Sequence, residues 1–390
     1  MRIAHVIQYI GKEFGGPVAG VAAMTGGLAA LGQQVELFTT HRKHEGEIID
    51  LAPEITAYVC RDVSLGTLRH SPSLWEAVKA SSCSLIHSHG LWGDPNRCAA
   101  DMARRKNVPH IIGPCGLLGP VALRRSRWKK RIVQLLFQDQ ALHGAACLLA
   151  NSGNEYLDFR SYGLGNPVAV IPNPVAGPQF MVNPVTGAEF RRRFSLDPTK
   201  KLLVFLGRIH PTKGVRRLVK TWGTLSEFHD EWHLVIAGPD EGNYRSMVAS
   251  DLGKLGCAPT VSFPGPLDDR WKWGLLQAAE LFVMPSKYEN FGIAIVEALL
   301  AGVPVVTTTG TPWRSLVDHG AGWHVDHAVQ VLGAALAEAM TLTDEARREM
   351  GLRGELLGRS FSVETIALKL LTLYRWLLDG GERPDFVETD

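Results

Sequence analysis

Short apolar runs of strand length alternate with stretches of helical spacing through the whole chain. In the first half these runs fall at 2–8, 34–39, 55–60, 85–88, 110–112, 147–150 and 168–171. The second half repeats the alternation, with runs at 202–206, 232–237, 260–263, 281–284, 303–307 and 322–325. Strands that alternate with helices predict parallel, doubly wound sheets. We therefore expect an α/β protein.

A change in composition separates the two halves. Prolines gather between the two alternations, at Pro172, Pro174, Pro178, Pro184 and Pro198. Such a stretch is typical of a connection between domains. We predict an N-terminal domain over 1–172, a linker over 173–200, a C-terminal domain over 201–360 and a last amphipathic helix over 361–380.

The composition excludes several classes of protein. The 390 residues are 45% hydrophobic, and no apolar run approaches the roughly 20 residues of a membrane-spanning helix. The first strand has no small-residue cleavage site after it, so we do not expect a signal peptide. A net charge of +2 is too small to indicate nucleic-acid binding. Six cysteines without paired spacing favour a reducing cytoplasm and no zinc site.

The clearest chemical signal lies at 285–304, PSKYENFGIAIVEALLAGVP. Glu289 precedes a helix that Gly292 opens, and Glu297 lies inside that helix. Both carboxylates can face the carboxyl edge of a parallel sheet beside a helix N-terminus, where phosphates and paired sugar hydroxyls bind. A Glu spaced in this way is usually a solvated residue, but apolar neighbours surround Glu297 on both sides.

A second phosphate-suited segment follows the first strand of the second half, GRIHPTKG at 207–214. Its spacing is not that of a P-loop. Arg208 and Lys213 are two positive charges on one loop, and either alone could simply be solvated. Their position on the same sheet edge as the helix that Gly292 opens favours a diphosphate pocket. The chain has no D-x-D motif, which disfavours a metal clamp on that diphosphate.

The first half offers weaker candidates. Gly15 and Gly16 follow the first strand and would let backbone amides approach a phosphate or sugar, although a double glycine is more commonly a plain turn. His89 follows a strand at its carboxyl end, and His87 shares its face. His89 could contact a ligand or be structural. The chain lacks G-x-G-x-x-G, which argues against a nicotinamide or flavin enzyme.

A basic segment at 120–143 is predicted to form one long helix. Its cations are Arg124, Arg125, Arg127, Lys129, Lys130 and Arg131, with Trp128 among them and Leu135, Leu136 and Phe137 after them. Such a run is commonly a solvated face. The alternative is a surface for anionic membrane or lipid diphosphate, because basic residues with an interfacial Trp suit that boundary.

These motifs resemble those of the retaining glycosyltransferases of family 4, of the bacterial polysaccharide-assembly type. The resemblance is carried by 207–214, by the two Glu separated by seven residues at 289–297, and by Gly15-Gly16. It extends over nearly the whole chain through HSHGLW, GPCGLLGP, IPNPV and TPWRSL. It implies the GT-B fold: two Rossmann-like domains face each other across a cleft, the donor binds mainly to the second domain, and the last helix returns to the first.

The resemblance also implies roles for single residues. Arg208 and Lys213 would neutralise the donor diphosphate, Glu297 would bind the ribose and Glu289 the transferred sugar. Further contacts would come from the backbone, at Gly15, Gly16, Asn290, Phe291, Gly292 and Ile293. Many relatives have a histidine or another polar residue where this chain has Cys115, so His89 is the alternative contact to the sugar. No cofactor is expected, because the nucleotide sugar is a substrate, and no metal is expected, because the chain has no D-x-D motif.

The predicted function is transfer of a hexose, with retention, from a nucleotide-diphosphate sugar to a glycan or polyprenyl-diphosphate-linked saccharide in cell-surface polysaccharide assembly. We expect a cytoplasmic enzyme, with peripheral attachment to the inner membrane face if the basic segment binds lipid. Two alternatives stay open. One is a soluble sugar-metabolism transferase with a small acceptor, and the other is a two-lobed sugar-binding protein without catalysis.

Overall fold

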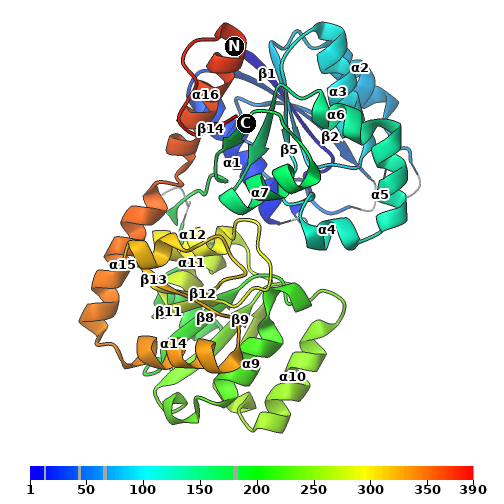
Figure 1. Ribbon diagram of the computed structural model, residues 1–390. Helices are drawn as coiled ribbons and strands as arrows, with labels where there is room; N and C mark the ends of the chain where they lie inside the picture. Colours follow the sequence, from blue (N-terminus) through cyan, green and yellow to red (C-terminus); the bar gives the residue numbers. More distant parts are fainter. Residues whose placement is uncertain (13–14, 43–44, 65–67, 179–182, 390) are drawn as a thin grey trace. The chain divides into compact units, whose positions relative to one another are not determined.

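The computed structural model describes residues 1–389 except 13–14, 43–44, 65–67 and 179–182. The chain divides into two compact units (Figure 1). Unit 1 consists of Met1–Pro174 and Val363–Asp390, and unit 2 of Val175–Ser362. Each contains its own parallel sheet, and the predicted fold class is confirmed.

Unit 1 contains an eight-stranded sheet in the order β14-β7-β6-β5-β4-β1-β2-β3. All neighbouring strands are parallel except β14, which pairs antiparallel with β7. Its strands are β1 (Arg2–Ile7), β2 (Gln34–His41), β3 (Thr56–Arg61), β4 (Leu85–His89), β5 (His110–Gly113), β6 (Cys147–Ala150), β7 (Val168–Val170) and β14 (Val387–Glu388). Its helices are α1 (Gly16–Ala30), α2 (Pro72–Ala80), α3 (Asp94–Lys106), α4 (Pro120–Arg124), α5 (Arg127–Val133), α6 (Asp139–His143), α7 (Gly153–Tyr162) and α16 (Val363–Asp379).

Helices cover both faces of this sheet because its strands are apolar on both sides. Alternate residues of β1 enter different cores: Ile3 and Ile7 pack beneath α1 and α16, whereas Ala4 and Val6 pack beneath α2 and α3. The face under α1 and α16 also carries His5. The strand order reverses between β1 and β4, which are direct neighbours.

The last long helix, α16, packs on α1 through a close contact at Gly27 (Figure 1, red and blue). A Cβ at Gly27 would lie 2.8 Å from Cγ1 of Val363 and 2.9 Å from Cβ of Ala367. The glycine therefore lets the two helices approach. Leu370 and Tyr374 of α16 are completely buried in the same core.

The segment 120–143 is not the single helix predicted from the sequence. Helix α4 ends at Arg124, Arg125 is extended, and Ser126 has left-handed angles (φ 53°, ψ 40°). After α5 the chain forms a π-helix, Gln134–Gln138, and then α6. The break is stabilised by Ala122, whose carbonyl accepts hydrogen bonds from Arg125 N–H and Lys130 Nζ. No Gly or Pro marks this break in the sequence.

Unit 2 contains a six-stranded parallel sheet in the order β10-β9-β8-β11-β12-β13. Its strands are β8 (Lys201–Leu206), β9 (Trp232–Ala237), β10 (Val261–Gly265), β11 (Leu281–Met284), β12 (Val305–Thr308) and β13 (Gly322–Val325). Its helices are α8 (Gly187–Arg193), α9 (Val215–Gly223), α10 (Tyr244–Leu255), α11 (Asp269–Gln277), α12 (Ile293–Leu300), α13 (Ser315–Asp318), α14 (Val329–Thr341) and α15 (Asp344–Arg359). The order reverses between β8 and β11, and ligands of doubly wound sheets bind at the carboxyl ends of strands at such a point.

The stretch 173–200 is not simply the linker that its prolines suggest. It contains α8, which begins with a capping box between Thr186 and Glu189 and packs on α11. Phe190 of α8 is completely buried in the core of unit 2. The two ends of unit 2 lie beside each other, because Val175 N–H donates to the carbonyl of Phe361 at 2.9 Å. Burial of an apolar helix face outweighs the local proline signal here.

Candidate functional site

Four loops of unit 2 leave the carboxyl ends of neighbouring strands around the reversal in strand order. They follow β9, β8, β11 and β12, and they span 238–243, 207–214, 285–292 and 309–314. The loops after β8 and β11 contain Arg208, Lys213 and Glu289. The predicted residues of the second half therefore meet on one edge of one sheet.

Lys213 and Glu289 form an ion pair between the loops after β8 and β11. Lys213 ends a short 3₁₀ turn, Pro211–Lys213, in which the N–H of Thr212 donates to Nδ1 of His210. Glu289 is held by its own N–H, which donates to the carbonyl of Gly310 at 2.8 Å. Both side chains are largely buried. The pair is thus fixed at the point where the strand order reverses.

Glycines let these loops lie against each other. Gly214 has a φ of +74°, and a Cβ there would lie 2.0 Å from the carbonyl oxygen of Pro285. A Cβ at Gly310 would lie 2.2 Å from the carbonyl oxygen of Ser286. Any larger residue at either position would force the loops apart.

Glu297 is buried on α12 and pairs with a lysine that the sequence argument missed. Nζ of Lys272 lies 2.7 Å from Oε1 of Glu297 and 2.6 Å from Oδ1 of Asp269. Burial alone would lower the pKa of Lys272, but the carboxylates of Glu297 and Asp269 outweigh it and raise the pKa. The ammonium therefore stays charged and balances the buried carboxylate. The signal in the sequence was a lysine between two tryptophans in a helical stretch, DRWKWGLL.

Arg208 is more exposed and pairs with a second residue that was not predicted, Glu241 in the loop after β9. Oε1 of Glu241 also lies 4.0 Å from Nε2 of His210. Both predicted cations, Arg208 and Lys213, therefore hold carboxylates in this structure. A diphosphate at this edge would have to replace those carboxylates.

Helix α12 begins at this edge, and its N-cap is Gly292, which has a φ of +90°. Phe291 is buried against Trp313, whose Nε1–H donates to the carbonyl of Phe291. The Phe291 side chain therefore belongs to the core, and a ligand could reach this residue only through its backbone. Asn290 and Ile293 flank the same turn.

In unit 1, Gly15 and Gly16 lie at the start of α1, as the sequence predicted. Gly15 is the N-cap with a φ of +67°, and no described atom lies within 4 Å of where its Cβ would be. Gly16 begins the helix, and Pro17 follows in its first turn. The open side of Gly15 suits the predicted approach of a ligand, which stays a prediction.

His89 is buried, and its Nε2 lies 2.9 Å from Nδ1 of His5. Burial lowers the pKa of His89 to about 3, so the imidazole is neutral. His87 is also buried and bonds the hydroxyl of Tyr374 at 2.7 Å. Cys115 Sγ donates to the carbonyl of Gly113, and loss of solvent raises the pKa of its thiol to about 12. Contact of His89 with a sugar stays a prediction.

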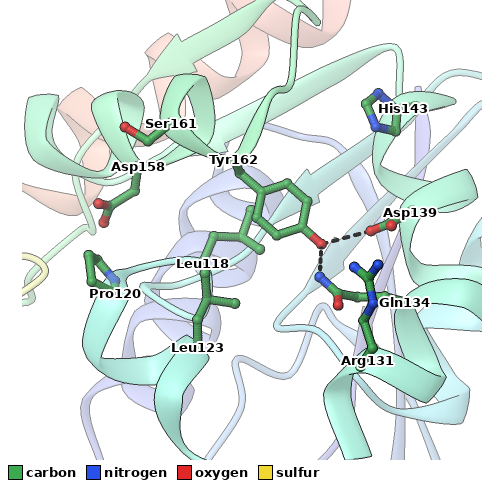
Figure 2. A pocket seen from close by; sticks show the side chains of 10 residues that line it. All are labelled: Leu118, Pro120, Leu123, Arg131, Gln134, Asp139, His143, Asp158, Ser161 and Tyr162. Carbon is green, nitrogen blue, oxygen red and sulfur yellow. Dashed lines mark hydrogen bonds between the residues drawn. The ribbon is translucent and has the colours of Figure 1, made fainter. Parts of the chain in front are cut away.

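Unit 1 also contains a cavity of about 470 Å³ between α4, the π-helix, α6 and α7 (Figure 2). Its walls combine apolar and polar side chains: Leu118, Pro120, Leu123, Arg131, Gln134, Asp139, His143, Asp158, Ser161 and Tyr162. The hydroxyl of Tyr162 donates to Asp139 at 2.7 Å and accepts from Gln134. Burial and the bond to Asp139 raise the pKa of Tyr162 to about 12.

A groove of about 1050 Å³ adjoins this cavity and shares four of its lining residues, Pro120, Leu123, Arg131 and Gln134. Beside it lies a surface that we call the basic–apolar face, formed by Val121, Arg124, Arg125, Arg127, Trp128, Lys129, Lys130, Arg131, Ile132, Leu135 and Leu136. Trp128, Leu135 and Leu136 are 67%, 74% and 72% exposed. Apolar side chains of this size so open to water usually mark a contact surface. None of the described helices is both long and apolar enough to cross a membrane.

Comparison with known proteins agrees with this arrangement. Residues 187–356 match the family described as glycosyl transferases group 1, and residues 15–174 match the glycosyl transferase 4-like domain. The D-inositol 3-phosphate glycosyltransferase of Segniliparus rotundus is 27% identical over 76% of this chain and 67% of its own. The lipopolysaccharide core biosynthesis mannosyltransferase LpsB of Rhizobium meliloti is 26% identical over 65% of this chain and 70% of its own.

Among solved structures, Anabaena Alr3699/HepE in complex with UDP and glucose matches 96% of this chain and 99% of its own, with a TM-score of 0.73 and 19% identity. The two family matches cover both units, and the sheet order of each unit is that of a doubly wound fold. The chain belongs to the glycosyltransferases of family 4, which have the GT-B fold.

Proposed function

We propose that this glycosyltransferase moves a hexose, with retention, from a nucleotide-diphosphate sugar to a glycan or lipid-linked saccharide in cell-surface polysaccharide assembly. The observation that carries the proposal is the edge of the unit 2 sheet. Lys213 and Glu289 meet there across the reversal in strand order, and Glu297 lies on the helix that begins beside them.

The donor site would work by charge. Cleavage of the sugar–phosphate bond leaves a nucleoside diphosphate and an oxocarbenium-like sugar. Arg208 and Lys213 would exchange their carboxylate partners for the diphosphate and stabilise the charge that grows on it. One such fixed contact is worth about 3–4 kcal/mol in a transition state. We propose that these cations take the place of a metal ion on the leaving group.

The two glutamates would bind hydroxyl groups. Glu297 pairs with Lys272 at one carboxylate oxygen, and a carboxylate can accept two strong hydrogen bonds from a ribose diol. Glu289 would turn from Lys213 to the transferred sugar when the lysine binds phosphate. We propose attack on the face that the leaving group departs from, since no side chain of the described site stands out as a nucleophile.

The acceptor proposal rests on unit 1. The cavity at Tyr162 offers carboxylates, a hydroxyl and an aromatic ring, which suit the polar edges and apolar faces of a sugar. The basic–apolar face beside it suits an anionic lipid surface, where each cation contributes about 1 kcal/mol. A lipid-linked saccharide would satisfy both, and the likeness to a lipopolysaccharide enzyme agrees with it. The likeness to an inositol-phosphate enzyme supports the alternative, a small soluble acceptor.

Thermal unfolding with UDP, GDP, ADP and their sugar conjugates tests the donor site, with and without a chelator. A nucleotide at 100 times its Kd adds about 2.7 kcal/mol of stability, which raises Tm by several degrees. We expect the nucleotides of one base to raise Tm. Lys213→Ala and Glu297→Ala should lose both this rise in Tm and the transfer activity. Arg359→Ala, in an exposed ion pair, is the control. Full transfer by both site variants would refute the assignment.

Sedimentation with vesicles tests the acceptor side. We expect binding to phosphatidylcholine vesicles that contain phosphatidylglycerol, and loss of it when Leu135 and Leu136 are changed to Ser. Leu352 and Leu356 on α15 are also exposed, at 58% and 67%, and their change to Ser should have no effect. If the protein does not bind these vesicles but glycosylates a small soluble acceptor, the alternative of a soluble sugar-metabolism transferase is favoured. A protein that binds free sugar but no nucleotide would favour the other alternative, a two-lobed sugar-binding protein without catalysis.

A further inference from the structure

Three histidines meet in the core of unit 1, beneath α1 and α16. His5 lies on β1, and His87 and His89 lie on β4. The register of the two parallel strands places His5 beside His87, and the two-residue period of a strand puts His89 on the same face. One ring nitrogen from each histidine lies within 4.8 Å of the other two. Exposure of the three residues is 0%, 0% and 3%.

Their hydrogen bonds leave ring nitrogens unused. Nδ1 of His5 bonds Nε2 of His89, and Nδ1 of His87 bonds the hydroxyl of Tyr374. Nε2 of His5 and Nε2 of His87 are buried and have no hydrogen-bond partner among the described residues. Native proteins rarely leave buried polar atoms in this state, and a bound ion is one of the standard explanations.

The surroundings favour the metal-binding form of the imidazole. All three rings are buried, and burial disfavours the protonated form, which has no electron pair for a metal. The Tyr374 hydroxyl fixes the orientation of His87 from the side away from Nε2, as outer partners of metal-bound histidines do. Gly113 on β5 keeps space beside the rings, since a Cβ there would lie 3.6 Å from Nε2 of His87 and 3.8 Å from Nδ1 of His89.

We propose that His5, His87 and His89 bind one divalent transition-metal ion of the zinc type. Imidazole nitrogens suit Zn²⁺, Cu²⁺ and Ni²⁺, and three of them with a water or hydroxide complete a four-coordinate site. Zinc–nitrogen bonds of about 2.0–2.1 Å place tetrahedral ligands roughly 3.3 Å apart, so the rings must close up and the His5–His89 bond must open. The ion would join β1 to β4 and, through Tyr374, to α16.

This site is separate from the donor chemistry. It uses residues of unit 1 only, whereas the donor residues lie in unit 2. The spacing of the cysteines predicted no zinc site, and the histidines did not enter that prediction. Their meeting depends on β4 lying next to β1, although 77 residues separate the end of β1 from the start of β4 in the chain.

The test is metal content and a cobalt spectrum of the full, untagged chain. We expect about one zinc per chain after growth with zinc and, after chelation, one equivalent of Co²⁺ with the intense visible bands of a tetrahedral site. His87→Gln should lose both. His110→Gln is the matched control: this buried histidine on β5 bonds Ser88 and lies outside the cluster, so it should retain both.

Two results would overturn the proposal. One is wild-type protein that neither retains zinc nor develops the cobalt bands, a measurement that needs no variant to fold. The other is a folded His87→Gln protein, checked by circular dichroism, that binds as much Co²⁺ as the wild type with the same spectrum. Zn²⁺ should also raise the Tm of the wild type and of His110→Gln, and leave that of His87→Gln unchanged.

Discussion

Lys272 is a residue whose removal tests the electrostatics of the donor site directly. Its ammonium is the charged partner of the buried Glu297 carboxylate. Lys272→Met keeps the length and the apolar stem of the side chain but leaves Glu297 without compensation. We expect the variant to lose stability in unit 2 and to bind nucleotide more weakly, because the buried carboxylate of Glu297 loses its hydrogen-bonded cation.

The size of the effect follows from burial. Removing one partner of a fully buried ion pair costs about 3–5 kcal/mol. The side chains of Lys272 and Glu297 keep 18% and 10% of their exposure, so some solvent reaches them. We therefore expect a loss of about 2 kcal/mol, which for a unit of this length lowers Tm by about 4–8 °C.

The assay is thermal and urea unfolding of Lys272→Met, Glu297→Gln and the double variant. The double variant should recover much of the lost stability, because it removes both charges together. Arg359→Met breaks an exposed pair and should cost less than about 0.5 kcal/mol. A Lys272→Met protein as stable as the wild type, or a double variant whose loss equals the sum of the two single losses, would refute the reasoning.

The same pair predicts a dependence on alkaline pH. The carboxylates raise the pKa of Lys272 above its ordinary value of 10.5, so the folded state binds this proton more tightly than the unfolded state. The contribution to stability is therefore fully present below pH 10.5 and is lost as the pH rises through the folded pKa. Wild-type protein and Lys272→Met should converge in stability above that range, and a constant difference would contradict this.

Three further predictions concern single positions. Gly214→Ala should destabilise unit 2 far more than Gly256→Ala in urea unfolding. Both glycines have a positive φ, but only at Gly214 does the added Cβ meet a backbone oxygen. Equal losses of stability would show that this contact does not matter. Gly27→Ala should loosen the packing of α16 and speed its amide exchange. Gly26→Ala has its nearest atom 3.7 Å away and should stabilise α1 by up to about 1 kcal/mol. No difference between the two variants would show that α16 does not depend on the contact at Gly27. Glu289→Gln should keep nucleotide binding in thermal shifts but lower kcat/KM for transfer, and unchanged transfer would exclude it from the sugar contact.

The fold could be predicted because the signals are local and repeated. A short apolar run in the sequence indicates each buried strand, as it does for β11 at Leu281–Met284. The loops with Arg208 and Glu289 could be placed on one edge because parallel strands all end on the same side of a sheet. The family likeness then completed the assignment, and the chain does belong to that family.

What could not be predicted depends on contacts between distant parts of the chain. Lys272 meets Glu297 from another helix, and Glu241 meets Arg208 from another loop. His5 lies beside His87 only because β1 and β4 are neighbours in the sheet, and the sequence pattern does not give the order of the strands. The break at Ser126 has no Gly or Pro to signal it, and the prolines of 173–200 concealed α8, whose apolar face finds its partner in α11.

Unit 1 is built from two stretches of chain, and this has a consequence for biosynthesis. A ribosome completes Met1–Pro174 first, but that part lacks α16 and the edge strand β14 until the whole of unit 2 has been made. At 5–20 residues per second the wait is roughly 10–40 s. Unit 2 is continuous and can fold as soon as it emerges. The apolar surface of α1 that α16 later covers stays open in the nascent chain for that time, which makes it the natural point of engagement for a cotranslational chaperone.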